Sequence, residues 1–67
     1  MGDIQKKCGQ LIRDQREKQG LLQRELAHST GLQVRTIGRI ERGEADVRIG
    51  TLEKIANALG VTIRDLV

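Results

Sequence analysis

The segment from residue 23 to residue 43 constrains this chain more than any other part of it. It reads QRELAHSTGLQVRTIGRIERG, in which two short stretches with apolar residues at helical spacing are separated by Gly31. Glycine takes a positive φ without steric cost, so Gly31 suits a tight turn between two helices. We therefore predict helices over residues 23–29 and 33–42, joined as a helix-turn-helix.

The second of these predicted helices separates apolar from cationic side chains. At about 100° per residue, Ile37 and Ile40 share one side, while Arg35, Arg39 and Arg42 lie within about 60° of one another on the opposite side. Three like charges on one face repel each other, so they do not stabilise the helix itself. A polyanion lying along that face, such as duplex DNA around a groove, would explain them. A solvated charged face without a partner is the alternative.

Size and charge fit a small binding domain. The chain has 67 residues, which predicts one domain over residues 1–67 with a thin core. Residues 1–22 hold five basic and three acidic side chains, and residues 23–43 hold four basic and two acidic ones. Residues 44–67 hold three basic and four acidic side chains, and the net charge of the chain is +3. The positive charge thus lies in the first two-thirds. The chain has no aromatic residue on which single-stranded bases would stack, which favours duplex DNA as the partner.

Several functional classes find no support in the sequence. The single cysteine, Cys8, and the single histidine, His28, form neither a disulfide nor a metal-ligand set, so we expect no metal and no cofactor. We expect Cys8 to lie in the core and His28 to be exposed and non-catalytic. No apolar run approaches the roughly 18 residues of a membrane span, and the polar start MGDIQKKCGQ is unlike a signal peptide. These features predict a cytoplasmic protein that is not an enzyme, since no nucleophile–base pair or phosphate-binding loop occurs.

The rest of the chain predicts three more helices, over residues 4–19, 51–59 and 63–67. Asp3 and Thr62 are placed to cap the first and the last of them. Because the chain lacks proline and is divided into short segments by glycine, the predicted class is all-α. The side chains expected to face inward are Ile4, Cys8, Leu11, Ile12, Leu26, Ala27, Leu52, Ile55, Ala56 and Leu59.

Residues 11–67 resemble a known family. They contain, in order and at the family's spacing, LIRDQREKQGLLQRELA, STGLQVRTIGRIERG and TLEKIANALGVTIRDL. On these motifs the chain resembles the Cro/repressor-type helix-turn-helix domains of the Xre family. The resemblance implies a compact five-helix bundle, like that of lambda repressor, in which helices two and three form the helix-turn-helix. It also implies a transcription regulator that binds double-stranded DNA as a homodimer on a symmetric operator.

The resemblance assigns roles to individual residues. Gln23 falls at the family's phosphate-contacting glutamine, and Arg42 falls at a second contact with the DNA backbone. The family's internal ion pair falls on Arg16 and Glu41, and the helical wheel agrees, because it places Glu41 near the apolar side, where a carboxylate needs a partner. The positions that read the groove fall on Gln33, Val34, Arg35, Gly38 and Arg39.

Two positions depart from the family's pattern, and two others remain open. Leu22 stands where the family often has a capping Ser, Thr or Asn, and Gln33 stands where it often has Ser. Each missing cap costs roughly 0.5–2 kcal/mol, and Leu22 also puts one phosphate contact in doubt. Val34 equally suits the edge of the core. Gly38 is explained either by close approach to DNA or by a weak position in the helix, where glycine costs about 1 kcal/mol relative to alanine.

The end of the chain predicts a dimer contact. A short terminal helix cannot bury Ile63, Leu66 and Val67 together against its own domain, and the remaining apolar patch would suit a second copy, with Asn57 or its neighbours contributing. The alternative is a frayed terminus with Leu66 alone in the core. The rival function is an antitoxin or another protein-interaction module on the same fold.

Overall fold

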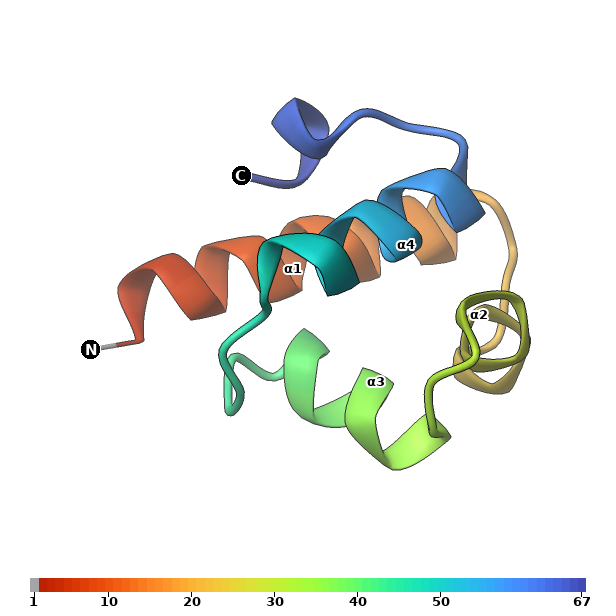
Figure 1. Ribbon diagram of the computed structural model, residues 1–67, viewed down its shortest axis with the longest axis horizontal. Helices are drawn as coiled ribbons and strands as arrows, with labels where there is room; N and C mark the ends of the chain where they lie inside the picture. Colours follow the sequence, from red (N-terminus) through yellow and green to blue (C-terminus); the bar gives the residue numbers. More distant parts are fainter. Residues whose placement is uncertain (1) are drawn as a thin grey trace.

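Four α-helices and one short 3-10 helix make up the protein. The structure is a computed structural model that describes residues 2–67. The elements, in chain order, are α1 (Asp3–Lys18), α2 (Gln23–Thr30), α3 (Val34–Glu41), α4 (Ile49–Leu59) and the 3-10 helix η1 (Ile63–Leu66) (Figure 1). Residues 2–67 contain no strand, which confirms the all-α class. The predicted fifth helix is a single 3-10 turn, so the description as a bundle of five α-helices is not confirmed.

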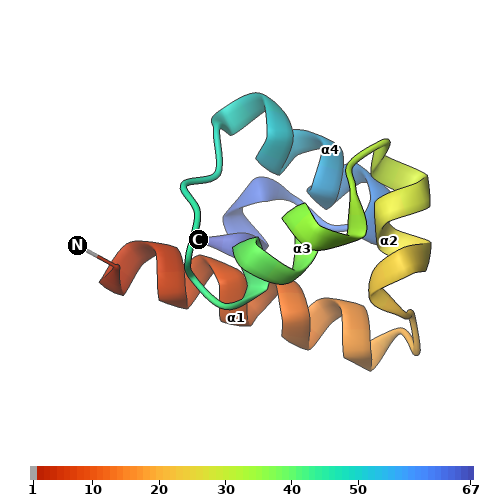
Figure 2. The same ribbon diagram turned by 90° about the horizontal axis from the view of Figure 1, so that it is seen from below.

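The two long helices separate α3 from the end of the chain. In Figure 1 α1 and α4 overlap at mid-height, with α3 below them and the C-terminal turn above, whereas Figure 2 shows α1 and α4 along opposite edges of the molecule. α2 contacts both α3 and α4, whereas η1 contacts α1 and α4. One face of the protein is therefore formed by α3, and the C-terminal segment lies on the opposite side.

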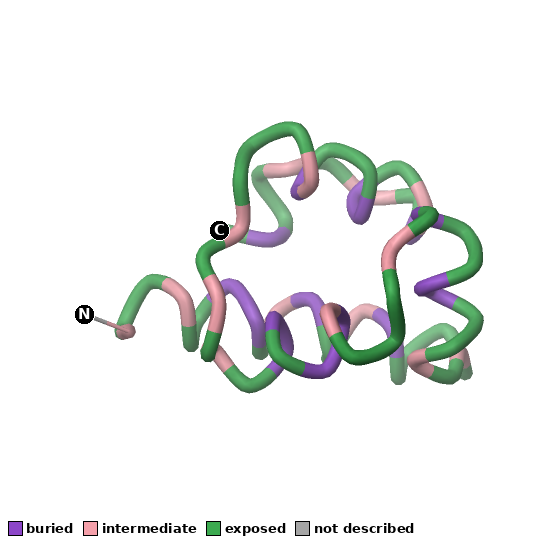
Figure 3. The backbone as a smooth tube through the Cα atoms, turned by 60° about the horizontal axis from the view of Figure 1, so that its bottom comes forward, coloured by how far each residue is buried: buried purple, intermediate pink, exposed green. Residues whose placement is uncertain are grey.

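The core is formed by residues from all five elements. Figure 3 shows buried residues along the inner faces of the helices and exposed residues along the outer faces. Complete burial of an aliphatic side chain stabilises the fold by roughly 1.5–3 kcal/mol. The side chains that are fully buried are Ile12, Leu26, Ile37, Ile55 and Leu66. The rest of the core consists of Cys8, Ala27, Ile40, Leu52, Ala56 and Leu59.

The inward-facing residues of α1 were predicted only in part. Cys8 and Ile12 are buried as predicted, but Ile4 is 81% exposed and Leu11 is only half-buried. The buried face of α1 instead continues from Ile12 to Arg16. The first turn of α1 extends beyond the rest of the molecule, so Ile4 has little to pack against (Figure 2).

The caps of the first and last helices follow the prediction only in part. Asp3 is the first residue of α1 rather than its cap, and the N–H of Gly2 donates a hydrogen bond to the side-chain oxygen of Gln5 (3.0 Å). Thr62 is the N-cap residue of η1, as predicted, although its hydroxyl makes no cap hydrogen bond. Instead the Asp65 carboxylate accepts hydrogen bonds from both the N–H and the hydroxyl of Thr62, each 3.0 Å long. These bonds hold the pKa of Asp65 below its usual value. Gly31 has a φ of +75°, as the predicted turn between α2 and α3 requires.

Candidate DNA interface

The outer face of α3 is cationic and exposed. Ile37 and Ile40 are buried beneath the helix, which confirms the predicted separation of its two sides. Val34 is 46% exposed, so it belongs to the outer side rather than to the core. Figure 2 views the molecule from the side on which α3 lies. The exposed side chains on or beside α3 are Gln33, Val34, Arg35, Arg39 and Arg42.

A buried ion pair fixes α3 to α1. Arg16 Nε lies 2.6 Å from Glu41 Oε2, and Arg16 Nη2 lies 3.0 Å from Glu41 Oε1, so the contact is bidentate. Both side chains are buried, and Arg16 Nη1 also donates to the carbonyl oxygen of Leu21 (2.7 Å). The hydrogen bonds with Glu41 raise the pKa of Arg16. The pair predicted from the resemblance is therefore present, and it holds the C-terminal end of α3 in place.

The same carboxylate orients the first residue of α2. Gln23 Nε2 donates a hydrogen bond to Glu41 Oε1 over 3.0 Å. The α2 N-cap, Leu22, has no side-chain cap, although its own N–H donates to Glu25 (2.8 Å). Within residues 2–67 the backbone N–H groups of Gln23 and Arg24 have no hydrogen-bond partner. A phosphate oxygen can accept hydrogen bonds from such free N–H groups at the start of a helix, with the oriented amide of Gln23 beside them.

Gly38 provides room for two of the predicted DNA-contacting side chains. It is buried, and an added Cβ would lie 3.1 Å from Arg42 Nη1 and 3.8 Å from the amide atoms of Gln23. Glycine at this position thus lets these two side chains lie over α3. This differs from the expected close approach of the DNA itself, because direct contact with Gly38 would first require Arg42 and Gln23 to move.

Arg42 has an acidic partner that the sequence analysis missed. Arg42 Nε and Nη2 donate to the two carboxylate oxygens of Glu44, over 3.0 Å and 3.2 Å. These hydrogen bonds raise the pKa of Arg42 and lower the pKa of Glu44. Gly43, with a φ of +73°, turns the chain between the two residues. The sequence indicates this pair only through the glycine, which allows a tight turn between an arginine and a glutamate.

Comparison with known proteins decides the family. A family model described as helix-turn-helix matches residues 12–66. The chain belongs to this helix-turn-helix family. A comparison with curated protein sequences finds no match.

Solved structures of similar proteins agree with the assignment to the helix-turn-helix family. The restriction-modification controller protein C.AhdI from Aeromonas hydrophila is 36% identical over 100% of both chains, with a TM-score of 0.93. The clp gene regulator ClgR from C. glutamicum is 27% identical over 94% of this chain and 82% of its own, with a TM-score of 0.91. The controller protein C.Esp1396I, crystallised as a tetramer in complex with its natural 35 base-pair operator, is 29% identical over 92% of this chain and 82% of its own, with a TM-score of 0.87.

One close backbone contact within this helix-turn-helix domain was not predicted. A Cβ added at Gly9 would lie 2.2 Å from the carbonyl oxygen of Ile40 and 2.9 Å from that of Glu41. Only glycine therefore lets α1 approach the end of α3 this closely. The available signal was a glycine inside a predicted helix, a position where it costs about 1 kcal/mol relative to alanine.

The predicted dimer residues are not equally available. Leu66 is fully buried in the core of its own domain, so its side chain has no exposed surface for a second copy, which corrects its assignment to the contact. Val67 is 60% exposed and Ile63 is half-buried. Both residues therefore retain accessible apolar surface.

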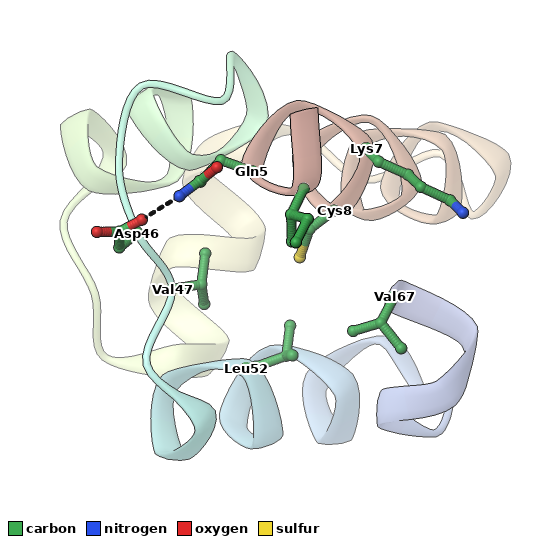
Figure 4. Close-up of a pocket in the computed structure, with 8 residues that line it drawn as sticks. Gln5, Lys7, Cys8, Asp46, Val47, Leu52 and Val67 are labelled. Atoms are coloured by element: carbon green, nitrogen blue, oxygen red, sulfur yellow. Dashed lines mark hydrogen bonds between the residues drawn. The ribbon is translucent and has the colours of Figure 1, made fainter. Parts of the chain in front are cut away.

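An apolar cleft of about 460 Å³ lies apart from α3. In Figure 4 the side chains of Cys8, Leu52 and Val67 point toward one another across it, and Lys7 points away. Gln5 donates a hydrogen bond to Asp46 at its edge. Burial raises the pKa of the Cys8 thiol, so Cys8 behaves as a small core residue. None of the predicted DNA-contacting residues lines this cleft.

The described part of the chain forms neither a metal-ligand cluster nor a membrane-spanning helix. Residues 2–67 contain no group of three His, Cys, Asp or Glu side chains that could hold a metal ion. No helix among them is both long enough and apolar enough to cross a membrane. His28 is exposed on α2.

Proposed function

We propose that this protein is a transcription regulator, not an enzyme, that binds duplex DNA sequence-specifically with α3 in the major groove. The observation that carries the proposal is the arginine face of α3. Arg35 and Arg39 are exposed there, and within residues 2–67 neither forms an ion pair. Unpaired guanidinium groups on one face of a helix suit guanine edges and phosphates, to which arginine donates two hydrogen bonds at once.

The contacts divide into base reading and positioning. Gln33 is the N-cap of α3 and Arg35 lies in its first turn, where a recognition helix reaches the base edges. Arg39 lies one turn further along the same face, and Val34 can contact a thymine methyl group. Gln23 and the free N–H groups of α2 would bind one phosphate, and Arg42 would bind another. The Arg16–Glu41 pair touches no DNA in this arrangement. It holds α3 and Gln23 in fixed positions relative to each other.

We also propose that the protein binds DNA as a homodimer on a symmetric operator. One helix reads only a few base pairs, and two linked copies would gain affinity through two half-sites about one helical turn apart. Two observations support an assembled form: exposed apolar surface at Ile63 and Val67, and the crystallisation of C.Esp1396I as a tetramer with its operator. The similarity to C.AhdI over the whole chain favours restriction-modification control as the process that is regulated.

Selection of bound sequences from random duplex DNA tests the proposal directly. We expect enrichment of a motif with two-fold symmetry, and a protein carrying Arg39→Ala should lose preference at one position of each half-site. The genes next to genomic copies of the motif would then test the link to restriction-modification control. Failure to enrich any sequence, with the protein folded, would contradict the proposal and favour the rival protein-interaction module.

A further inference from the structure

We propose that Glu44 is an intramolecular competitor for phosphate at Arg42, so that a DNA phosphate has to displace its carboxylate before it binds this arginine. The inference rests on the proposed function, since it concerns a residue of the same surface. Glu44 would act through Arg42 and lower the affinity for every duplex, whatever its sequence.

The geometry of the pair makes the two anions exclude each other. Glu44 takes both Nε and Nη2 of Arg42, which form one edge of the guanidinium. A phosphate group is recognised by the same fork of two parallel N–H groups. The remaining nitrogen, Nη1, lies over the backbone of α3 at Gly38, beside the amide of Gln23. The carboxylate therefore occupies the edge of the guanidinium that does not include the nitrogen over α3.

The exposure of the pair makes the exchange feasible. The side chains of Arg42 and Glu44 are 56% and 54% exposed, so water and ions reach both. Ion pairs of this kind contribute little to folding and are screened by salt, and a dense row of phosphates can replace the carboxylate. The positive charge of Arg39 also helps to lower the pKa of Glu44, which places this carboxylate in the field of two arginines of the α3 face.

The pair has a consequence for salt dependence. A free arginine that binds a phosphate releases roughly one counterion from DNA, which makes binding fall more steeply as salt is added. When the arginine is already paired with Glu44, added salt also screens this ion pair, so the cost of displacing the carboxylate falls as salt rises. This partly offsets the loss of the phosphate contact at high salt, and the Arg42 contact makes the salt slope less steep than a free arginine would.

Replacement of Glu44 by its neutral isostere tests this. We expect Glu44→Gln to bind both the selected operator and an unrelated duplex about two- to fivefold more tightly, the range that an exposed ion pair supports. The slope of log K against log salt should become steeper by a fraction of the roughly one unit that a whole phosphate contact contributes. The matched control is Glu53→Gln on α4, which removes the same charge from an exposed residue that forms no ion pair within residues 2–67, and its effect should be smaller.

A double substitution separates competition at Arg42 from a general charge effect. In a protein that carries Arg42→Gln, the further change Glu44→Gln should leave affinity and salt slope almost unaltered. An equal gain in that background, or weaker binding by Glu44→Gln alone, would overturn the inference. If the wild type binds duplex DNA and Glu44→Gln matches it, only the inference fails. If the wild type binds no duplex, both the proposed function and the inference are wrong.

Discussion

Arg39 lies on the exposed face of α3 without an acidic partner among the described residues, which makes it the clearest probe of base reading. Arg39→Ala should weaken binding to the selected operator by about 1–3 kcal/mol and relax the preference at one base pair, because a bidentate contact with guanine is lost. Titrations with the operator and with an unrelated duplex measure both effects. Lys54→Ala, an exposed cation on α4, is the control and should bind nearly as the wild type does. Wild-type discrimination by Arg39→Ala would place the reading residues elsewhere.

Glu41 is the residue on which the buried network depends, because it accepts hydrogen bonds from both Arg16 and Gln23. Glu41→Ala would leave the buried Arg16 guanidinium without its partner, and removal of one member of a buried pair costs about 3–5 kcal/mol. In a domain of this size, such a loss is comparable to the whole stability. Thermal unfolding should therefore show a largely unfolded variant. Glu53→Ala, which removes an exposed carboxylate from α4, should melt within a few degrees of the wild type, and similar melting of both variants would contradict the buried role of Glu41.

At the scale of elements, the contact between α1 and α3 depends on one missing side chain. Gly9→Ala would place a Cβ 2.2 Å from a backbone oxygen of α3, and the two helices would have to move apart. We expect a loss of about 1–3 kcal/mol or more, the cost of an overpacked contact. Gly50→Ala is the matched control, since Gly50 lies in the first turn of α4 with open space around it, and alanine there should stabilise by up to about 1 kcal/mol. Chemical denaturation of the two variants should give changes of opposite sign, and a stabilised Gly9→Ala would show that the helices are not so close.

The elements were predictable where the signal is local. Apolar residues at helical spacing and the turn at Gly31 place α2 and α3 to within a residue or so of their observed ends. The Arg16–Glu41 pair came from the family resemblance, not from spacing. What was missed depends on segments that meet only in the folded chain. Ile4 continues the apolar stripe of α1 but is 81% exposed at the edge of the cleft, and Gly9 is close to α3 only because α1 crosses it.

At the scale of the whole molecule, the proposed homodimer requires two copies to present α3 to the same duplex. The two-fold axis then has to point toward the DNA, so the contact between copies cannot cover α3. α1 and α4 separate α3 from η1, so the C-terminal segment can meet a second copy without covering the arginine face (Figure 1). The apolar residues of this segment with accessible surface are Val67 and the half-buried Ile63.

The proposed dimer contact is best tested at Val67, which is exposed, and at Ile63, which is half-buried and also packs against the core. Val67→Glu and Ile63→Lys each place a charge on accessible apolar surface, so both should shift sedimentation from dimer to monomer while the helical circular-dichroism signal remains. Leu66→Glu would be a poor probe, because Leu66 is fully buried and a charge there would unfold the domain. Ser29→Glu, at an exposed position of α2, adds a charge away from the contact and should remain dimeric. Monomeric variants should also bind a symmetric operator more weakly than the wild type while keeping their affinity for a single half-site, since each copy retains its own α3. A wild type that stays monomeric both at high concentration and on a symmetric operator would rule out the dimer.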